Sequence, residues 1–169
     1  MTIRFLNSDD VSAYTALRLN SLKESPFAFS DSYEDQVSKT KEDFENEIRQ
    51  AGMESFTLGA FTDTNILVGF VRFKRDQRTK ARHRASLHSL YVAPQFRGEG
   101  IAKKLVGELL SKIQSLEGLE QLQLSSLISE TSPISFYEKL GFQKLGGILV
   151  KDLIIEGQYV DAIYMVKYL

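Results

Sequence analysis

The most informative stretch of the chain is Leu90-Tyr91-Val92-Ala93-Pro94-Gln95-Phe96-Arg97-Gly98-Glu99-Gly100-Ile101-Ala102, where an apolar strand stops at a proline, turns through two glycines and enters a helix. Because glycine lacks a Cβ atom, Gly98 and Gly100 allow unusual backbone angles and the close approach of a ligand. The first amides of the following helix have no intrahelical acceptor, and the helix dipole favours negative charge at the same place. The stretch therefore predicts a cradle for a phosphate or pyrophosphate.

The helix after this turn is predicted from Ile101, Leu105, Leu109 and Ile113, which recur at four-residue spacing. Two better-known phosphate motifs fit poorly. A P-loop needs a lysine and a hydroxyl residue after its second glycine, and the dinucleotide fingerprint needs a third glycine where this chain has Lys103. Both motifs are therefore disfavoured.

Length and composition predict one domain, residues 1–169, because 43% hydrophobic content is enough to fill a core of this size. The chain has no cysteine, which excludes disulfides, thiolate metal sites and a cysteine nucleophile. It has no apolar run of the length of a signal peptide or a membrane helix. We therefore expect a cytoplasmic protein without a membrane partner.

The net charge of −1 argues against a protein that binds nucleic acid through a general electrostatic footprint. Charge is nevertheless uneven: residues 72–84 are rich in Arg and Lys, with the one acid Asp76, whereas residues 31–54 hold more acids than bases. Either both regions are solvated surfaces, or the acidic one attracts a cationic amine and the basic one meets phosphates or a partner.

Hydrophobic periodicity predicts helices placed among the strands of a mixed sheet, in the order βααβββαβαββ and the fold class α/β (α+β). The connection Phe27-Ala28-Phe29 is unusually apolar, so it either packs onto the core or walls an acceptor pocket. Strands are expected at residues 2–6, 56–61, 66–73, 84–92, 119–125, 142–150 and 158–168, and helices from 11 to near Pro26, at 33–51, 99–114 and 133–140.

A second distinctive stretch runs from residue 130 to 142. Ser132 is a predicted N-cap with Pro133 at the first helical position, and Gly141 is the predicted C-terminal stop. Within it, Ser135-Phe136-Tyr137-Glu138-Lys139-Leu140-Gly141-Phe142 resembles the helix-then-strand segment of the GNAT superfamily of acetyl-CoA-dependent N-acetyltransferases. Gln95-Phe96-Arg97-Gly98-Glu99-Gly100 matches that superfamily's coenzyme A signature, Gln/Arg-x-x-Gly-x-Gly/Ala. Two matches in the right order make the resemblance fairly specific.

The resemblance implies a mixed, mostly antiparallel central sheet flanked by helices, and acetyl-CoA as co-substrate without a metal. The backbone of the fourth strand would bond the pantetheine arm, with the amide of Leu90 polarising the thioester oxygen. The pyrophosphate would rest on amides from Arg97 to Ala102, and the Arg97 side chain would add a charge-assisted contact. The implied binding residues are Leu90, Tyr91, Val92, Gln95, Arg97, Gly98, Glu99, Gly100, Ile101, Ala102 and Ser132.

For the chemistry, Tyr137 matches the tyrosine that protonates the departing thiolate, although a tyrosine on an amphipathic helix also suits a core. His88 lies on the strand face toward which the superfamily directs its base, and imidazole titrates near neutrality. It ranks ahead of Glu24, Glu34 and Glu54, and a water relay is the alternative. The chain departs from the superfamily pattern at Glu130 and Pro133, where asparagine and alanine are usual.

The acceptor is expected to be a small-molecule amine or a protein amino group, and a homodimer is left open. The acceptor site should be shaped by residues 18–29, the polar helix after them and the last two strands. The competing hypothesis is a non-catalytic acyl-CoA-binding sensor or scaffold, which would have no chemical reason to keep a phenol at Tyr137.

Overall fold

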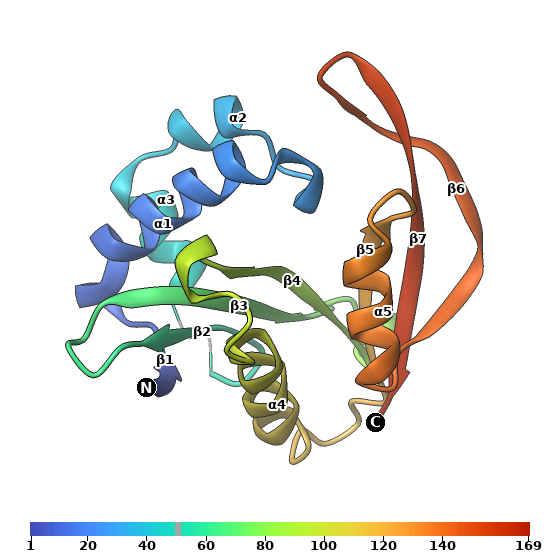
Figure 1. Cartoon of the computed structure of the whole chain (residues 1–169). Coiled ribbons are helices and arrows are strands. Elements are labelled where there is room, and N and C mark those ends of the chain that lie inside the picture. Colours follow the sequence, from blue (N-terminus) through green and yellow to red (C-terminus); the bar gives the residue numbers. More distant parts are fainter. Residues whose placement is uncertain (50–51) are drawn as a thin grey trace.

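A twisted sheet forms the centre of the computed structural model, which describes residues 1–49 and 52–169 (Figure 1). Within these residues the strand order is β1-β2-β3-β4-β5-β7-β6. β4 and β5 run parallel, and the other neighbouring pairs are antiparallel, which confirms the predicted mixed, mostly antiparallel sheet. The strands are β1 (Thr2–Phe5), β2 (Ser55–Phe61), β3 (Leu67–Arg75), β4 (Arg84–Val92), β5 (Gln121–Leu127), β6 (Gln143–Ile155) and β7 (Gln158–Tyr168).

Helices cover both faces of the sheet. Figure 1 shows α1, α2 and α3 on one side of β1 to β4, α4 on the other side, and α5 beside β5 and β7. Among the described residues, none of these helices has the length and apolar character needed to cross a membrane. Their bounds are α1 (Val11–Glu24), α2 (Tyr33–Val37), α3 (Lys41–Ile48), α4 (Ile101–Ile113) and α5 (Thr131–Lys139).

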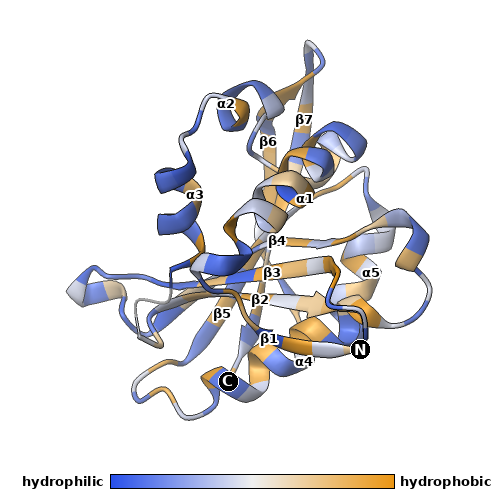
Figure 2. Cartoon of the chain, turned by 90° about the vertical axis from the view of Figure 1, so that its left-hand side faces the viewer, coloured by the Kyte–Doolittle hydropathy of each residue, from blue (hydrophilic) through white to orange (hydrophobic). Residues whose placement is uncertain are grey.

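The core has one part on each face of the sheet. On one face, Leu105 and Leu109 of α4 pack against the inner strands, and on the other, Tyr14 of α1 and Phe44 of α3 pack around Phe70. Figure 2 shows this pattern in α3, whose hydrophobic residues face the sheet while its outer side is hydrophilic. The helices therefore hold both faces of β3 and β4 in place.

The predicted helix over residues 33–51 is wrong in its continuity. The structure has two short helices, α2 and α3, because Thr40 starts a new helix: its hydroxyl accepts from the Asp43 amide, and the Asp43 carboxylate accepts from the Thr40 amide. This capping box competes with helix continuation through residues 38–40. The predicted end at Ala51 lies outside the described residues.

The start of α5 also differs from the prediction. Glu130, not Ser132, occupies the N-cap position, and no side-chain cap bond is formed there. The helix begins at Thr131, so Pro133 still falls in the first turn, where a missing amide costs no intrahelical bond. Ser132 is consequently an exposed residue of the first turn rather than a cap.

Gly107 lies inside α4 with its Cα exposed, and an added Cβ would meet no atom within 4 Å. Gly107→Ala is expected to stabilise the fold by about 0.5 to 1 kcal/mol, because alanine loses less backbone entropy in a helix. Thermal unfolding followed by circular dichroism should show the increase. Gly69→Ala is the matched control, because its Cβ would lie 2.8 Å from the Tyr91 carbonyl oxygen and should destabilise. A lower melting temperature for Gly107→Ala would contradict this account.

Candidate active site

The sheet opens between its two parallel strands. β4 and β5 pair only where residues 84–86 meet residues 121–123, and beyond that point they separate. A cavity of about 1100 Å³ lies at the opening. It is lined by the connection after α1, by β3, β4 and β5, by the start of α5 and by parts of β6 and β7. Two strand edges with unused backbone groups therefore face a single space.

A β-bulge in β4 sets which side chains face this cavity. Arg72 of β3 is paired with His88, but Phe70, two residues before it, is paired with Tyr91, three residues beyond His88. The extra residue is absorbed at Ser89, whose φ is +54°. His88 and Tyr91 therefore share one face, and Leu90 has no partner residue in β3. Leu90, a predicted binding residue, therefore lies in the bulge and lines the cavity.

The turn before α4 has the backbone expected of an anion cradle. Gly98 has φ of +85°, and Gly100, the N-cap of α4, has φ of +75°. An added Cβ at either glycine would meet nothing within 4 Å, so the space beside them is open. The Lys104 amide makes the bond to the Gly100 carbonyl, which leaves the amides of residues 101–103 without an intrahelical acceptor.

This cradle leads to a binding prediction. Gly100→Glu should weaken coenzyme A binding by about 10- to 100-fold, because a carboxylate would stand beside the pyrophosphate. Gly100→Gln is the matched control: it imposes the same left-handed backbone on a side chain of equal size, without charge. Isothermal titration calorimetry should separate the two variants. Equal affinities for wild type and Gly100→Glu would mean that the pyrophosphate binds elsewhere.

Arg97 connects the turn to the end of α1. Its Nε donates to the Val92 carbonyl at 2.9 Å, and its Nη1 and Nη2 donate to Glu24 at 3.2 and 2.7 Å. The Tyr91 hydroxyl also donates to Glu24. Arg97 lowers the pKa of Glu24, first by hydrogen bonding. Glu24 is thus an anchored anion and a poor proton acceptor, and the phosphate contact of Arg97 stays a prediction.

Tyr137 lies on α5 and lines the same cavity. Its ring packs edge-on against Phe136 and Phe142, with centroids 5.2 and 5.5 Å away. Within the described part of the chain, its hydroxyl has no hydrogen-bond partner. Burial raises the pKa of Tyr137 above its ordinary value of 10.0, so the phenol keeps its proton at neutral pH. The side chain is both a core residue and a protonated donor beside the cavity.

His88 is an exposed residue of β4 and lines the cavity. Desolvation, followed by the charges of Arg72 and Lys74, lowers the pKa of His88 from 6.5, while the charge of Asp31 opposes this. The imidazole is therefore neutral at pH 7 and free to accept a proton. The structure thus brings His88 and Tyr137, 49 positions apart in the printed sequence, to one cavity.

The other predicted residues divide into two groups. Glu34 and Glu54 do not line the cavity, and Glu54 instead accepts from Arg82 at 3.0 Å. Among the described residues, no group of three His, Asp or Glu side chains is placed to hold a metal.

The predicted binding residues lie either in the cavity lining or next to it. Those that line the cavity are Leu90, Tyr91, Val92, Arg97, Ala102 and Ser132. Those that belong to the adjoining turn and helix start are Gln95, Gly98, Glu99, Gly100 and Ile101.

The connection after α1 both packs and walls the cavity. Phe29 is buried against Tyr91, with ring centroids 6.2 Å apart, and Phe27 and Asp31 line the cavity beside it. The sequence predicted that this connection shapes the acceptor site but did not single out Asp31. It also treated Arg72 as part of a basic surface; only the pairing of β3 with β4 reveals that it faces His88.

The basic segment of residues 72–84 is largely tied into the fold. Arg75 is buried and donates to the carbonyls of Arg82 and Glu117, while Asp76 forms ion pairs with Arg78 and Arg84. These contacts use much of the charge that the sequence left open for a partner.

A splayed sheet, a glycine turn with free amides and a cavity lined by a phenol and an imidazole are the features that the resemblance to acetyl-CoA-dependent transferases predicts. Comparison with known proteins names the class: the model of the acetyltransferase (GNAT) family matches residues 18–142. The chain belongs to this family, and the resemblance carried by the two motifs is confirmed.

Curated relatives and solved structures agree with this assignment. The chain is 32% identical over 81 residues to N-alpha-acetyltransferase 30 of Saccharomyces cerevisiae, covering 48% of this chain and 46% of that protein. It is 29% identical over 79 residues to a spermidine N(1)-acetyltransferase of Vibrio cholerae, covering 47% and 45%. The chain thus spans about half the length of these relatives.

Among solved structures, a GNAT acetyltransferase from Streptococcus pneumoniae superposes with a TM-score of 0.87 at 25% identity, over 99% of both chains. A phosphinothricin acetyltransferase from Sinorhizobium meliloti, in complex with AcCoA, has a TM-score of 0.80 at 21% identity, over 99% of this chain and 88% of that one.

Proposed function

We propose that residues 1–169 form a single N-acetyltransferase domain that moves acetyl from acetyl-CoA to a primary amine by direct attack. The observation that carries the proposal is the joint presence of neutral His88 and protonated Tyr137 at one cavity, which the bulge residue Leu90 also lines. Acetyl transfer needs a base for the amine, a donor for the thioester oxygen and an acid for the thiolate. His88 would be the base, the Leu90 amide the donor and Tyr137 the acid.

The chain's own groups fit acetyl-CoA as a co-substrate. The amides at the start of α4 suit the pyrophosphate, and the open edges of β4 and β5 suit the extended pantetheine arm, which can bond a free strand edge. In this arrangement the Leu90 amide donates to the thioester oxygen. The side chain of Arg97 would contribute charge near the phosphates while keeping its bond to the Val92 carbonyl.

The proton steps balance over the two side chains. An acceptor that arrives as an ammonium first gives its extra proton to water, and His88 takes the second proton from the attacking nitrogen as the new N–C bond forms. The C–S bond then breaks, and Tyr137 gives its proton to the departing sulfur. Water returns a proton to Tyr137 and takes one from His88, so the protein ends as it began. No further reactant is needed.

The acceptor is an amine, and its identity is not specified by the family. The relatives named above include an N-alpha-acetyltransferase and a spermidine acetyltransferase, so small amines and protein amino groups both belong in a screen. The cytoplasmic location expected from the sequence stays a prediction, and a homodimer stays open.

The test is an acceptor screen with acetyl-CoA that monitors release of free thiol and confirms each acetylated product by mass. We expect turnover with at least one class of primary amine. If coenzyme A binds while no amine is acetylated, the enzyme proposal fails and the sensor hypothesis takes its place. If coenzyme A itself does not bind, both hypotheses fail.

A further inference from the structure

The part of the cavity around His88 is lined by charged side chains of both signs. Arg72 lies directly opposite His88 on β3, and Lys74, two residues further along, lies opposite Ser86. These four residues line the cavity. Two residues of a strand span about 7 Å, and the charges of both cations act on the imidazole.

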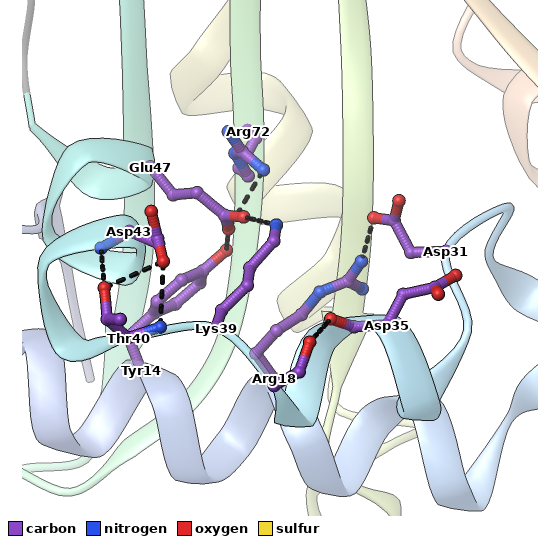
Figure 3. A network of polar contacts seen from close by, with 10 residues as sticks. Tyr14, Arg18, Asp31, Asp35, Lys39, Thr40, Asp43, Glu47 and Arg72 are labelled. Atoms are coloured by element: carbon purple, nitrogen blue, oxygen red, sulfur yellow. Dashed lines mark hydrogen bonds and ion pairs between the residues drawn. The ribbon is translucent and has the colours of Figure 1, made fainter.

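The protein neutralises this positive charge only in part. Within the described residues, the Lys74 side chain forms no ion pair or hydrogen bond, and the Arg72 side chain has one partner, Glu47, reached from Nη1 at 3.2 Å. Glu47 is shared, because it also accepts from Lys39 at 2.6 Å and from the Tyr14 hydroxyl at 3.2 Å (Figure 3). Among the described residues, Glu47 is thus the only carboxylate that pairs with Lys39 or Arg72, and none pairs with Lys74.

Of the carboxylates that line the cavity, Asp31 is the one whose charge acts on His88. Asp31 lines the cavity with 46% of its side chain exposed, and its Oδ2 accepts from Nη2 of Arg18 at 2.5 Å (Figure 3). Its Oδ1 has no partner among the described residues. Asp31 also acts electrostatically on His88, which places it within reach of the same point.

Arg18 gives Asp31 its fixed position. Its side chain is 1% exposed, its guanidinium lies 4.7 Å from the centre of the Phe29 ring, and its Nε and Nη1 are buried without a partner in the described chain. Burying a guanidinium is costly, so one that is held mainly by Asp31 and a ring indicates a specific role. We infer that this role is to hold a carboxylate at the cavity wall.

We propose that the acceptor is a free α-amino acid, or an analogue with another anion beside its primary amine, whose amine lies between Asp31 and His88 and whose anion lies on Arg72 and Lys74. This inference rests on the proposed function and names its substrate class. A simple ammonium ion placed at His88 would be repelled by two incompletely paired cations, whereas a neighbouring carboxylate neutralises them. The pairing of Arg72 with His88 across the two strands calls for an anion only a few bonds from the amine.

The test measures binding separately from transfer. With coenzyme A bound to the full chain, common L-amino acids are titrated by calorimetry against their own amides and their decarboxylated amines. We expect at least one amino acid to bind about 10-fold or more tightly than both partners. The amides also stand for peptide N-termini, so tighter binding of amides would overturn the proposal in favour of a protein acceptor. Tighter binding of decarboxylated amines, or no binding of any amino acid, would overturn it as well.

Variants identify the side chains that bind the carboxylate and the amine of the amino acid. Lys74→Ala should remove most of the preference for the carboxylate, and Lys74→Glu should reverse it. Lys80→Ala is the control, because Lys80 is exposed in the same basic segment and does not line the cavity. Asp31→Asn should weaken the amino acid and its amide alike. An unchanged preference in both Lys74 variants would overturn the assignment.

The readouts also separate this inference from the proposed function. If amino acids bind with the expected preference but are never acetylated, the charge assignment stands and the enzyme proposal fails. If amines are acetylated without regard to a carboxylate, the enzyme proposal stands and this inference fails.

Discussion

Tyr137→Phe is expected to lower kcat by about 10²- to 10⁴-fold, the usual range for loss of a general acid, while coenzyme A affinity barely changes. The substitution removes only the hydroxyl. Because this hydroxyl has no hydrogen-bond partner within the described chain, no protein hydrogen bond is lost with it. The ring keeps its edge-on packing against Phe136 and Phe142, so the fold should be unaffected. Steady-state kinetics with an acceptor from the screen, together with calorimetry on coenzyme A, measure the two quantities.

Tyr159→Phe is the control, because Tyr159 is an exposed tyrosine of β7 outside the cavity lining. It should match wild type in both measurements. A Tyr137→Phe enzyme with wild-type kcat would leave protonation of the thiolate to water. If the variant instead loses coenzyme A affinity in proportion to its activity, Tyr137 positions the ligand and is not the acid.

Local sequence signals were sufficient for most of the fold. The glycine turn, the alternating strands and the amphipathic α4 each carry their information in neighbouring residues, and the structure has these elements close to their predicted bounds. The errors arose where two local preferences compete. Thr40 and Asp43 can end one helix by beginning another, and periodicity over residues 33–51 does not reveal that choice.

The candidate site could be predicted only in part, because its geometry depends on contacts between distant segments. Nothing in the composition around Ser89 indicates a bulge, since serine is not a residue that favours positive φ. Yet the bulge contains Leu90 and puts Tyr91 on the face of His88. Arg97 is similar: its motif suggests a phosphate contact, but its bidentate pair with Glu24 depends on where α1 ends.

The charges around His88 also come from segments that are distant in the sequence. Arg72 and Lys74 belong to a basic run that reads as surface, and Asp31 belongs to an acidic one. Strand pairing and the buried Arg18 bring the three together around one imidazole. Desolvation lowers the pKa of His88 first, and the charges of Arg72 and Lys74 lower it further while that of Asp31 opposes them.

His88→Gln is expected to lower kcat by about 10²- to 10⁴-fold at pH 8 and to change the shape of its pH profile. The pKa of His88 is lowered below 6.5 by desolvation and by the charges of Arg72 and Lys74. Wild-type kcat should therefore be constant above pH 7 and fall as the pH drops through that lowered pKa, where the imidazole gains a proton and stops acting as a base. Glutamine cannot titrate, so this acidic limb should be absent from the variant.

His83→Gln is the matched control, since His83 is the other histidine of the chain and does not line the cavity. It should keep both wild-type kcat and the acidic limb. Because Tyr137 has a raised pKa, it stays protonated throughout the range measured and cannot supply that limb. A His88→Gln enzyme that keeps the limb would show that another group titrates. Glu24 is not a candidate for this group, because its ion pair with Arg97 holds the pKa of Glu24 below the ordinary value. The acceptor would then have to lose its proton to another base through a water molecule.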